Sequence, residues 1–160
     1  MEYASVDSPI GPLLLAADAT GLRILSFAGS SRAVSVGEDW VPDRGRLRQV
    51  RAELDAYFAG TLRNFTVALS PAGTPFQRLV WAALCAIPYG ETISYLELAR
   101  RVGNTKAVRA VGLANGANPI AIIMPCHRVV GSNGKLVGYG GGLPIKQALL
   151  ALESGQGKMI

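Results

Sequence analysis

The segment at residues 70–75, Ser-Pro-Ala-Gly-Thr-Pro, constrains the fold of this 160-residue chain more than any other feature. Serine, proline and glycine mark turns and loops, and Thr74-Pro75 is typical of the cap and first turn of a helix. Strand patterns prevail before this break and helix patterns after it. We therefore predict an α+β chain, with an N-terminal domain over residues 1–70 and a C-terminal domain over residues 71–160.

The N-terminal domain is predicted to combine short strands with one helix. Residues 4–6, 12–17 and 22–27 are apolar runs bounded by turn signals, and residues 65–69 are a last strand candidate. Between them an apolar side chain recurs at helical spacing, at Leu47, Val50, Leu54, Tyr57 and Phe58. Gly60 stands where a helix cap belongs. This pattern indicates a small α/β domain.

The C-terminal domain is predicted to be mainly helical. Its first helix starts at Thr74-Pro75 and ends at Pro88-Tyr89-Gly90. We expect one face of this helix to carry the apolar residues Phe76, Leu79, Val80, Ala83 and Leu84. A last amphipathic helix is predicted over residues 143–153, and the apolar run at residues 120–124 is expected to be a buried strand.

Two short helices in the middle of this domain form a helix-turn-helix pattern. Ser94 and Glu97 have the spacing of a capping box at the start of the first helix. The second helix, from Lys106 to about Asn115, carries Arg109 among small residues, which let a helix lie close to DNA. Small residues also suit packing against a neighbouring helix, so the pattern alone leaves both roles open.

The positive charge of the chain lies in its second half. Residues 1–88 contain eight basic and eight acidic side chains, whereas residues 89–160 contain eight basic and three acidic ones. A locally basic surface favours a polyanionic partner such as nucleic acid. A solvated basic face without a partner would have the same composition.

Cys126 is the strongest candidate for a nucleophile. Only the thiolate reacts, and a free thiol is largely protonated at neutral pH, so a reactive cysteine needs a base or a positive charge beside it. His127, the single histidine, is adjacent, although neighbouring side chains in an extended segment face opposite ways. A tight turn or a bridging water would have to couple them. Alternatively Cys126 is a buried small hydrophobe, which is our interpretation of Cys85.

Two further features limit the chemistry. Two cysteines and one histidine cannot complete a four-ligand zinc site without carboxylates, so we expect no metal, and we expect no cofactor. The glycine-rich segment 138–142 lacks the spacing of a phosphate-binding loop. It is either a flexible connector or a place where backbone approaches a flat ligand, with Tyr139 as a wall.

Several motifs in the C-terminal half occur together in one order. They are Tyr89-Gly90-Glu91-Thr92-Ile93-Ser94-Tyr95, Arg109-Ala110-Val111-Gly112, Asn118-Pro119, Pro125-Cys126-His127-Arg128-Val129 and Gly138-Tyr139-Gly140-Gly141-Gly142. In this order and spacing the chain resembles the O6-alkylguanine-DNA alkyltransferases, also called methylated-DNA–protein-cysteine methyltransferases. The resemblance covers residues 74–153 strongly. It implies that the N-terminal domain is ribonuclease-H-like and lacks the zinc ligands that some members carry.

The resemblance implies a catalytic role for six residues. Cys126 would accept the alkyl group, and His127 would take the thiol proton through a water. Glu153 would orient His127, and Asn118 would tie together the turn before the cysteine. The two residues expected to stabilise the leaving guanine are Tyr95 and Lys146.

The resemblance also implies a substrate and DNA surface. Arg109 would enter the duplex and fill the space of an extruded guanine. Tyr95, Tyr139 and the backbone of Val129 and Gly140 would line the base pocket. The remaining residues expected on the DNA and substrate side are Lys106, Ala107, Ala110 and Arg128.

The function implied is direct-reversal DNA repair, with irreversible transfer of an alkyl group from O6-alkylguanine to Cys126. The expected partner is double-stranded DNA containing the lesion, bound by a monomer in the cytoplasm; O4-alkylthymine as a substrate and cooperative binding stay open. No apolar run has the length of a membrane span, and the first residues lack a signal-peptide pattern. Two other classes remain: a lesion sensor or transcription regulator, and a cysteine hydrolase with repeated turnover.

Overall fold

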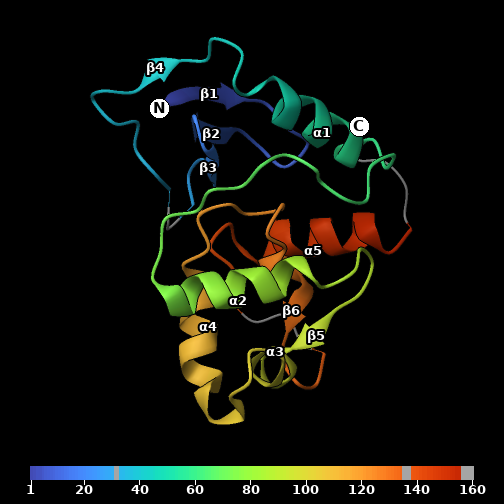
Figure 1. The fold of residues 1–160 in the computed structure, drawn as a ribbon. Coiled ribbons are helices and arrows are strands. Elements are labelled where there is room, and N and C mark those ends of the chain that lie inside the picture. Colours follow the sequence, from blue (N-terminus) through green and yellow to red (C-terminus); the bar gives the residue numbers. More distant parts are fainter. Residues whose placement is uncertain (31–32, 135–137, 156–160) are drawn as a thin grey trace.

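A four-stranded sheet forms the centre of the N-terminal domain (Figure 1). The computed structural model of the chain describes residues 1–30, 33–134 and 138–155. The strands β1 (Glu2–Val6), β2 (Leu13–Asp18), β3 (Gly21–Phe27) and β4 (Val41–Pro42) lie in the order β3-β2-β1-β4. Neighbours are antiparallel except β1 and β4, and the first three strands match the predicted runs.

The predicted helix of this domain is confirmed, but the predicted strand at residues 65–69 is wrong. Helix α1 (Arg48–Phe58) buries Val50, Leu54, Tyr57 and Phe58. The 65–69 segment is irregular apart from an isolated bridge between Leu22 and Leu69. Backbone donors that a strand would use are bound instead by a carboxylate: Glu53 accepts hydrogen bonds from the Thr66 and Val67 amides.

Helix α2 (Pro75–Cys85) opens the C-terminal domain as predicted. The Thr74 hydroxyl accepts a hydrogen bond from the Gln77 amide, and the Gln77 side chain accepts one from the Thr74 amide. The buried face differs from the prediction, because Trp81 lies inside, with its indole N–H 2.9 Å from the Ala114 carbonyl. Leu79, expected inside, is 51% exposed.

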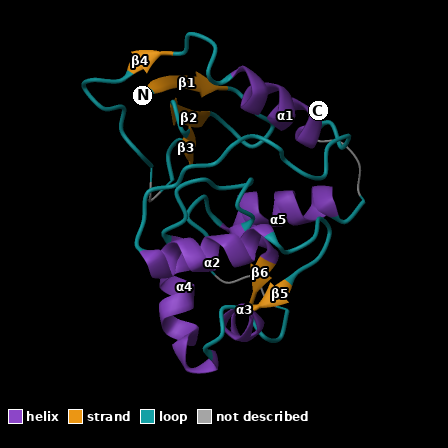
Figure 2. Ribbon diagram, viewed as in Figure 1, coloured by secondary structure: helices purple, strands orange, loops and turns teal. Residues whose placement is uncertain are grey.

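The two helices of the predicted helix-turn-helix pack against each other and against α2 (Figure 2). They are α3 (Tyr95–Arg101), which follows the short strand β5 (Ile93–Ser94), and α4 (Val108–Gly116), which follows the 3-10 turn η1 (Thr105–Ala107). The capping box is only half formed. The Ser94 hydroxyl accepts from the Glu97 amide, but the Glu97 carboxylate pairs with Arg100 and Arg101.

The apolar run at residues 120–124 is buried, but it is a turn and not the expected strand. It touches β3 through two hydrogen bonds, from Leu25 N to the Pro119 carbonyl and from Ala121 N to the Leu25 carbonyl. The left-handed backbone of Ile122, at φ 72°, prevents an extended run. This turn leads into η2 (Cys126–Arg128) and β6 (Val129–Val130), which pairs with β5.

Helix α5 (Leu143–Glu153) has the predicted bounds and joins the two domains. Leu149 and Leu152 are buried, and the core that contains them is continuous from the sheet to α2 and α4. In Figure 1, α5 lies in the middle of the molecule, between α1 and α2. No helix in the described part of the chain combines the length and the apolar character of a membrane span.

Candidate active site

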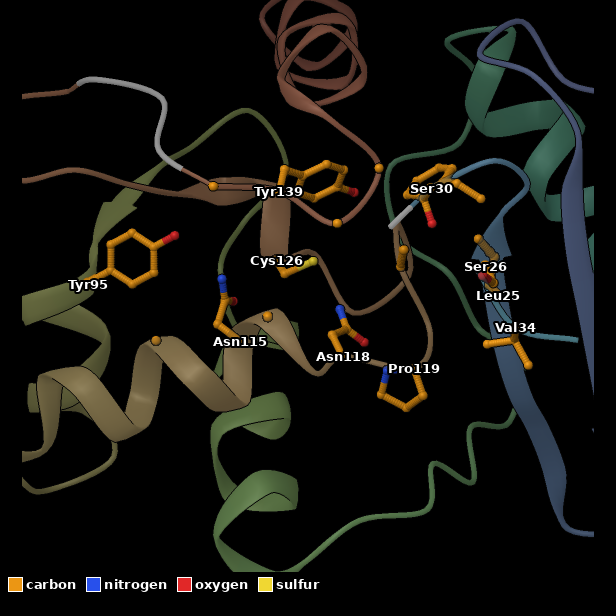
Figure 3. Close-up of a pocket in the computed structure, with 17 residues that line it drawn as sticks. Leu25, Ser26, Ser30, Val34, Tyr95, Asn115, Asn118, Pro119, Cys126 and Tyr139 are labelled. Atoms are coloured by element: carbon orange, nitrogen blue, oxygen red, sulfur yellow. The ribbon is translucent and has the colours of Figure 1, made fainter. Parts of the chain in front are cut away.

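Cys126 lies at a cavity of about 350 Å³ that both domains line. Figure 3 shows its sulfur between Tyr139 on one side and Asn115 and Asn118 on the other. The N-terminal domain contributes Leu25, Ser26, Phe27, Ser30 and Val34 to the wall, and α4 contributes Gly112, Asn115 and Gly116. Tyr95 and the glycine-rich segment with Tyr139 and Gly140 complete it. Clefts of this size with a few polar groups are typical small-molecule sites.

The turn that carries Cys126 is pinned by Asn118. Its amide nitrogen donates to the Met124 carbonyl at 2.7 Å, and its amide oxygen accepts from Ile120 N at 2.9 Å. One side chain thus connects both ends of the turn. The structure therefore places Asn118 where the sequence prediction put it, beside the turn that precedes the cysteine.

A buried carboxylate, that of Glu153, lies behind the cavity. Its Oε2 is 2.7 Å from His127 Nε2 and 2.6 Å from the Tyr57 hydroxyl. Arg128 donates through Nε to Oε1 at 2.7 Å and through Nη2 to Oε2 at 3.1 Å. Burial alone would raise the pKa of Glu153, but the hydrogen bonds from His127 and Arg128 outweigh it and hold this pKa at about 2. Glu153 is therefore ionised throughout the neutral range.

His127 is held as a neutral base. Burial lowers its pKa, although the Glu153 carboxylate acts in the opposite direction. Because Nε2 faces a carboxylate, it carries the proton. Nδ1 is buried and has no hydrogen-bond partner among the residues described. The lone pair of Nδ1 is thus left to accept a proton.

The thiol of Cys126 is protonated at rest, because burial raises its pKa; Asn118 and Lys146 lower it only in part. Lys146 is fully buried, its Nζ lies 2.7 Å from the Val129 carbonyl, and burial lowers its pKa. A positive charge nearby therefore does not generate a resting thiolate here. Reaction requires a base, which is the chemistry that His127 supplies.

Helix α4 and the turn before it carry exposed cations beside the cavity. Arg109, Ala110 and Lys106 are exposed on α4 and η1, and Ala107 is half-buried. Leu113, one turn beyond Arg109, is 67% exposed. The cavity residues Gly112 and Gly116 are three and seven positions after Arg109, so they lie on the same side of the helix as the arginine, next to it. One helix can therefore present a cation beside the wall of the pocket.

The structure brings the predicted catalytic residues together around Cys126 and leaves Arg109, Lys106, Ala107 and Ala110 outside the cavity lining. Two more residues predicted on the substrate side, Arg128 and Val129, also lie outside it. Arg128 does not line the cavity, because its guanidinium is bound to Glu153 and to the Ile87 carbonyl at 2.6 Å. Val129 is buried and also outside the lining, and its carbonyl is occupied by Lys146. The prediction for Cys85 is wrong, because this residue at the end of α2 is exposed and not buried.

Sequence reasoning missed Tyr57 and Asn115. Tyr57 looked like an ordinary core position of α1, and its partner lies 96 residues away, so no local pattern could reveal the contact. Asn115 is 6% exposed and lines the cavity. A polar residue on the inner face of the predicted helix was a usable signal. Among the described residues, no three His, Cys, Asp or Glu side chains are grouped to hold a metal ion.

Comparison with known proteins decides the family. A sequence model described as "6-O-methylguanine DNA methyltransferase, ribonuclease-like domain" matches residues 1–71, and one described as "6-O-methylguanine DNA methyltransferase, DNA binding domain" matches residues 75–155. The chain belongs to the 6-O-methylguanine DNA methyltransferase family. The two descriptions confirm the predicted fold, with a ribonuclease-like domain before a helical DNA-binding one.

Other members of this methyltransferase family match the chain over almost its whole length. The methylated-DNA–protein-cysteine methyltransferase of Methanosarcina acetivorans is 55% identical over 96% of this chain and 98% of its own length. The methyltransferase of Mycobacterium tuberculosis is 53% identical over 96% of this chain and 92% of its own length. The crystal structure of Mycobacterium tuberculosis OGT in complex with DNA aligns with a TM-score of 0.92 and 51% identity, over 99% of this chain and 96% of that one.

Proposed function

We propose that this chain repairs DNA directly, by transferring an alkyl group from O6 of guanine to the sulfur of its own Cys126. The observation that carries the proposal is a cysteine at a cavity, backed by a buried histidine–carboxylate pair in which one imidazole nitrogen has no partner among the described residues. This arrangement activates a nucleophile beside a pocket that can hold a flat base.

The first step is removal of the thiol proton. His127 Nδ1 accepts it through a bridging water, and the imidazolium is stabilised by Glu153 at 2.7 Å. A buried carboxylate holds the imidazole in one tautomer and orientation throughout. Asn118 keeps the turn rigid, so that the sulfur stays at the cavity.

The second step is an in-line displacement at the alkyl carbon. A sulfur–carbon bond forms as the carbon–O6 bond breaks, and the guanine leaves with the bonding electrons. It takes a proton from the Tyr95 hydroxyl, and that proton is replaced through the site by the one that His127 took from the thiol. Tyr95 lines the cavity, and Lys146 lies close enough to the sulfur to influence its pKa. We assign to these two residues the stabilisation of the departing base. The thioether product has no easy reverse path, so each molecule acts once.

Access to the lesion requires the nucleotide to leave the base stack. Arg109 is exposed on α4, on the same side of the helix as Gly112 and Gly116, which line the cavity. We propose that Arg109 fills the space of the extruded guanine, while Lys106, Ala107 and Ala110 follow the minor groove, where binding is largely independent of sequence. Tyr139 and Gly140 would then enclose the base.

Intact-protein mass measurement tests this function. The protein is incubated with duplex containing O6-methylguanine, and peptide mapping locates the added mass. We expect one methyl group per protein on Cys126 and none on Cys85, with Cys126→Ala as the unreactive control. An unmodified Cys126 in folded protein, or release of many methyl groups per molecule, would overturn the proposal; repeated turnover would instead indicate a hydrolase.

Three finer points extend the proposal. We propose O6-alkylguanine as the main lesion and a monomer as the active form, and we place the reaction in the cytoplasm. Parallel assays with O4-methylthymine duplex test the first point. Sedimentation of free and DNA-bound protein tests the second, and cell fractionation tests the third.

A further inference from the structure

A tyrosine of the N-terminal domain reaches the carboxylate that holds the active-site histidine. Tyr57 lies near the end of α1, its side chain is fully buried, and its hydroxyl donates to Glu153 Oε2 at 2.6 Å. The same oxygen lies 2.7 Å from His127 Nε2. Arg128 Nη2 is the third donor to this oxygen, at 3.1 Å, so donors from both domains share it.

We propose that Tyr57 is a positioning residue for alkyl transfer, which sets the orientation and the proton affinity of the Glu153–His127 pair. Its hydroxyl is not at the cavity that holds the base, so it acts through Glu153. This inference deepens the proposed function and depends on that function for its link to the reaction. It assigns the N-terminal domain a part in the chemistry, in addition to its part in the cavity wall.

The physical argument concerns the charge on one oxygen. A phenol that donates to Oε2 neutralises part of its negative charge, so the carboxylate attracts the proton of His127 less strongly. Hydrogen bonds in a buried, poorly solvated site influence one another more than they do in water. Loss of the Tyr57 hydroxyl leaves His127 and the longer bond from Arg128 on that oxygen, so His127 becomes more basic.

The hydroxyl stays a donor at every relevant pH. Burial and the neighbouring Glu153 charge both raise the pKa of Tyr57. The ring has a separate role, because it packs against the rings of Phe58, Phe65 and Tyr89 at centroid distances of 5.3, 5.4 and 6.3 Å. Tyr57→Phe keeps these ring contacts and removes only the hydrogen bond, so the variant separates the two roles.

Other titratable groups face the pair and remain unchanged in that variant. Cys126 and Arg128 come from η2, and Lys146 comes from α5. Tyr89 lies in the loop between α2 and β5, and Tyr139 lies in the segment before α5. Tyr89 provides a matched control, since its hydroxyl lies 3.5 Å from the Leu152 carbonyl and makes no hydrogen bond to Glu153.

The test uses the single histidine of the chain. The imidazole signals of His127 are followed by NMR across pH in the full-length protein, in Tyr57→Phe and in Tyr89→Phe. The pH profile of methyl transfer is measured on the same samples. We expect Tyr57→Phe to raise the midpoint of the His127 titration, and the acid limb of the rate profile, by about one pH unit, and Tyr89→Phe to move neither.

An unchanged or lowered midpoint in folded Tyr57→Phe would overturn the inference, and so would a shifted titration with an unmoved acid limb. If Tyr57→Phe does not fold, the wild-type protein decides: a nuclear Overhauser contact between the Tyr57 hydroxyl proton and the His127 Nε2 proton is required, and its absence overturns the proposal. Failure of methyl transfer in wild-type protein would instead remove the proposed function, while the His127 titration still reports on Tyr57.

Discussion

Glu153→Gln removes the charge on which His127, Arg128 and Tyr57 converge, and its effect on folding can be worked from the structure. The pKa of this carboxyl is about 2 in the folded protein, against an ordinary value of 4.5. A difference of about 2.5 pH units corresponds to about 3 kcal/mol of folding stability. The variant also leaves the buried Arg128 without its counter-charge, which typically costs about 3–5 kcal/mol.

The sign follows from the direction of the shift. Because the folded pKa lies below the unfolded one, the unfolded chain binds the proton more tightly. The stabilisation is therefore complete above about pH 4.5 and is lost as the pH falls toward 2. By pH 3 about 2 kcal/mol of it is gone. Glu153 is 4% exposed, so solvent screens this contribution little.

Urea unfolding at intervals from about pH 3 to pH 7 measures the effect for wild type, Glu153→Gln and the control Glu91→Gln. Glu91 is exposed, and its loss is expected to change the free energy of unfolding by no more than about 0.5 kcal/mol. The difference between wild type and Glu153→Gln should shrink by about 2 kcal/mol toward pH 3. A difference that is constant with pH would refute the argument, because it would mean that the lost stability is not electrostatic.

Further predictions address the cysteine, the arginine and the turn. Cys126→Ala should abolish methyl transfer but bind methylated duplex with unchanged affinity in a gel-shift assay; residual transfer would contradict the assignment. Arg109→Ala should slow repair in duplex more than reaction with free O6-methylguanine base, and equal losses in the two kinetic assays would count against its role in extrusion. Asn118→Ala loses hydrogen bonds of 2.7 and 2.9 Å to the turn. It should lower the free energy of unfolding by about 2 kcal/mol, and a change below about 0.5 kcal/mol would show that the turn holds without it.

Local patterns were sufficient for much of the fold. The helices α1 and α5 follow from apolar spacing, and Gly60, with a φ of 78°, stands just after α1 as predicted. The break at residues 70–75 separates two segments with different patterns. The errors have physical causes. Residues 65–69 have the composition of a strand, but a distant carboxylate, Glu53, binds two of their amides.

The site was predictable only where its residues are close in sequence or belong to a familiar motif. Cys126, His127 and Asn118 stand in one segment, and the resemblance pointed to Glu153. The Tyr57 hydroxyl could not be predicted, because its partner is set by how two domains pack. The burial of Arg128 could not be predicted from the motif either, because the motif specifies that an arginine follows the histidine but not which groups surround it.

The contrasting surroundings of the two cysteines have a practical consequence for quantifying active protein. Cys85 is an exposed residue at the end of α2, although partial burial of its thiol raises its pKa, whereas Cys126 is 7% exposed. General thiol reagents modify accessible sulfur first. A maleimide or disulfide titration of a native sample would therefore count Cys85, and would give nearly the same reading before and after the suicide reaction. A Cys85→Ser background, or a probe shaped like the base, is needed before labelling can report how much reactive protein remains.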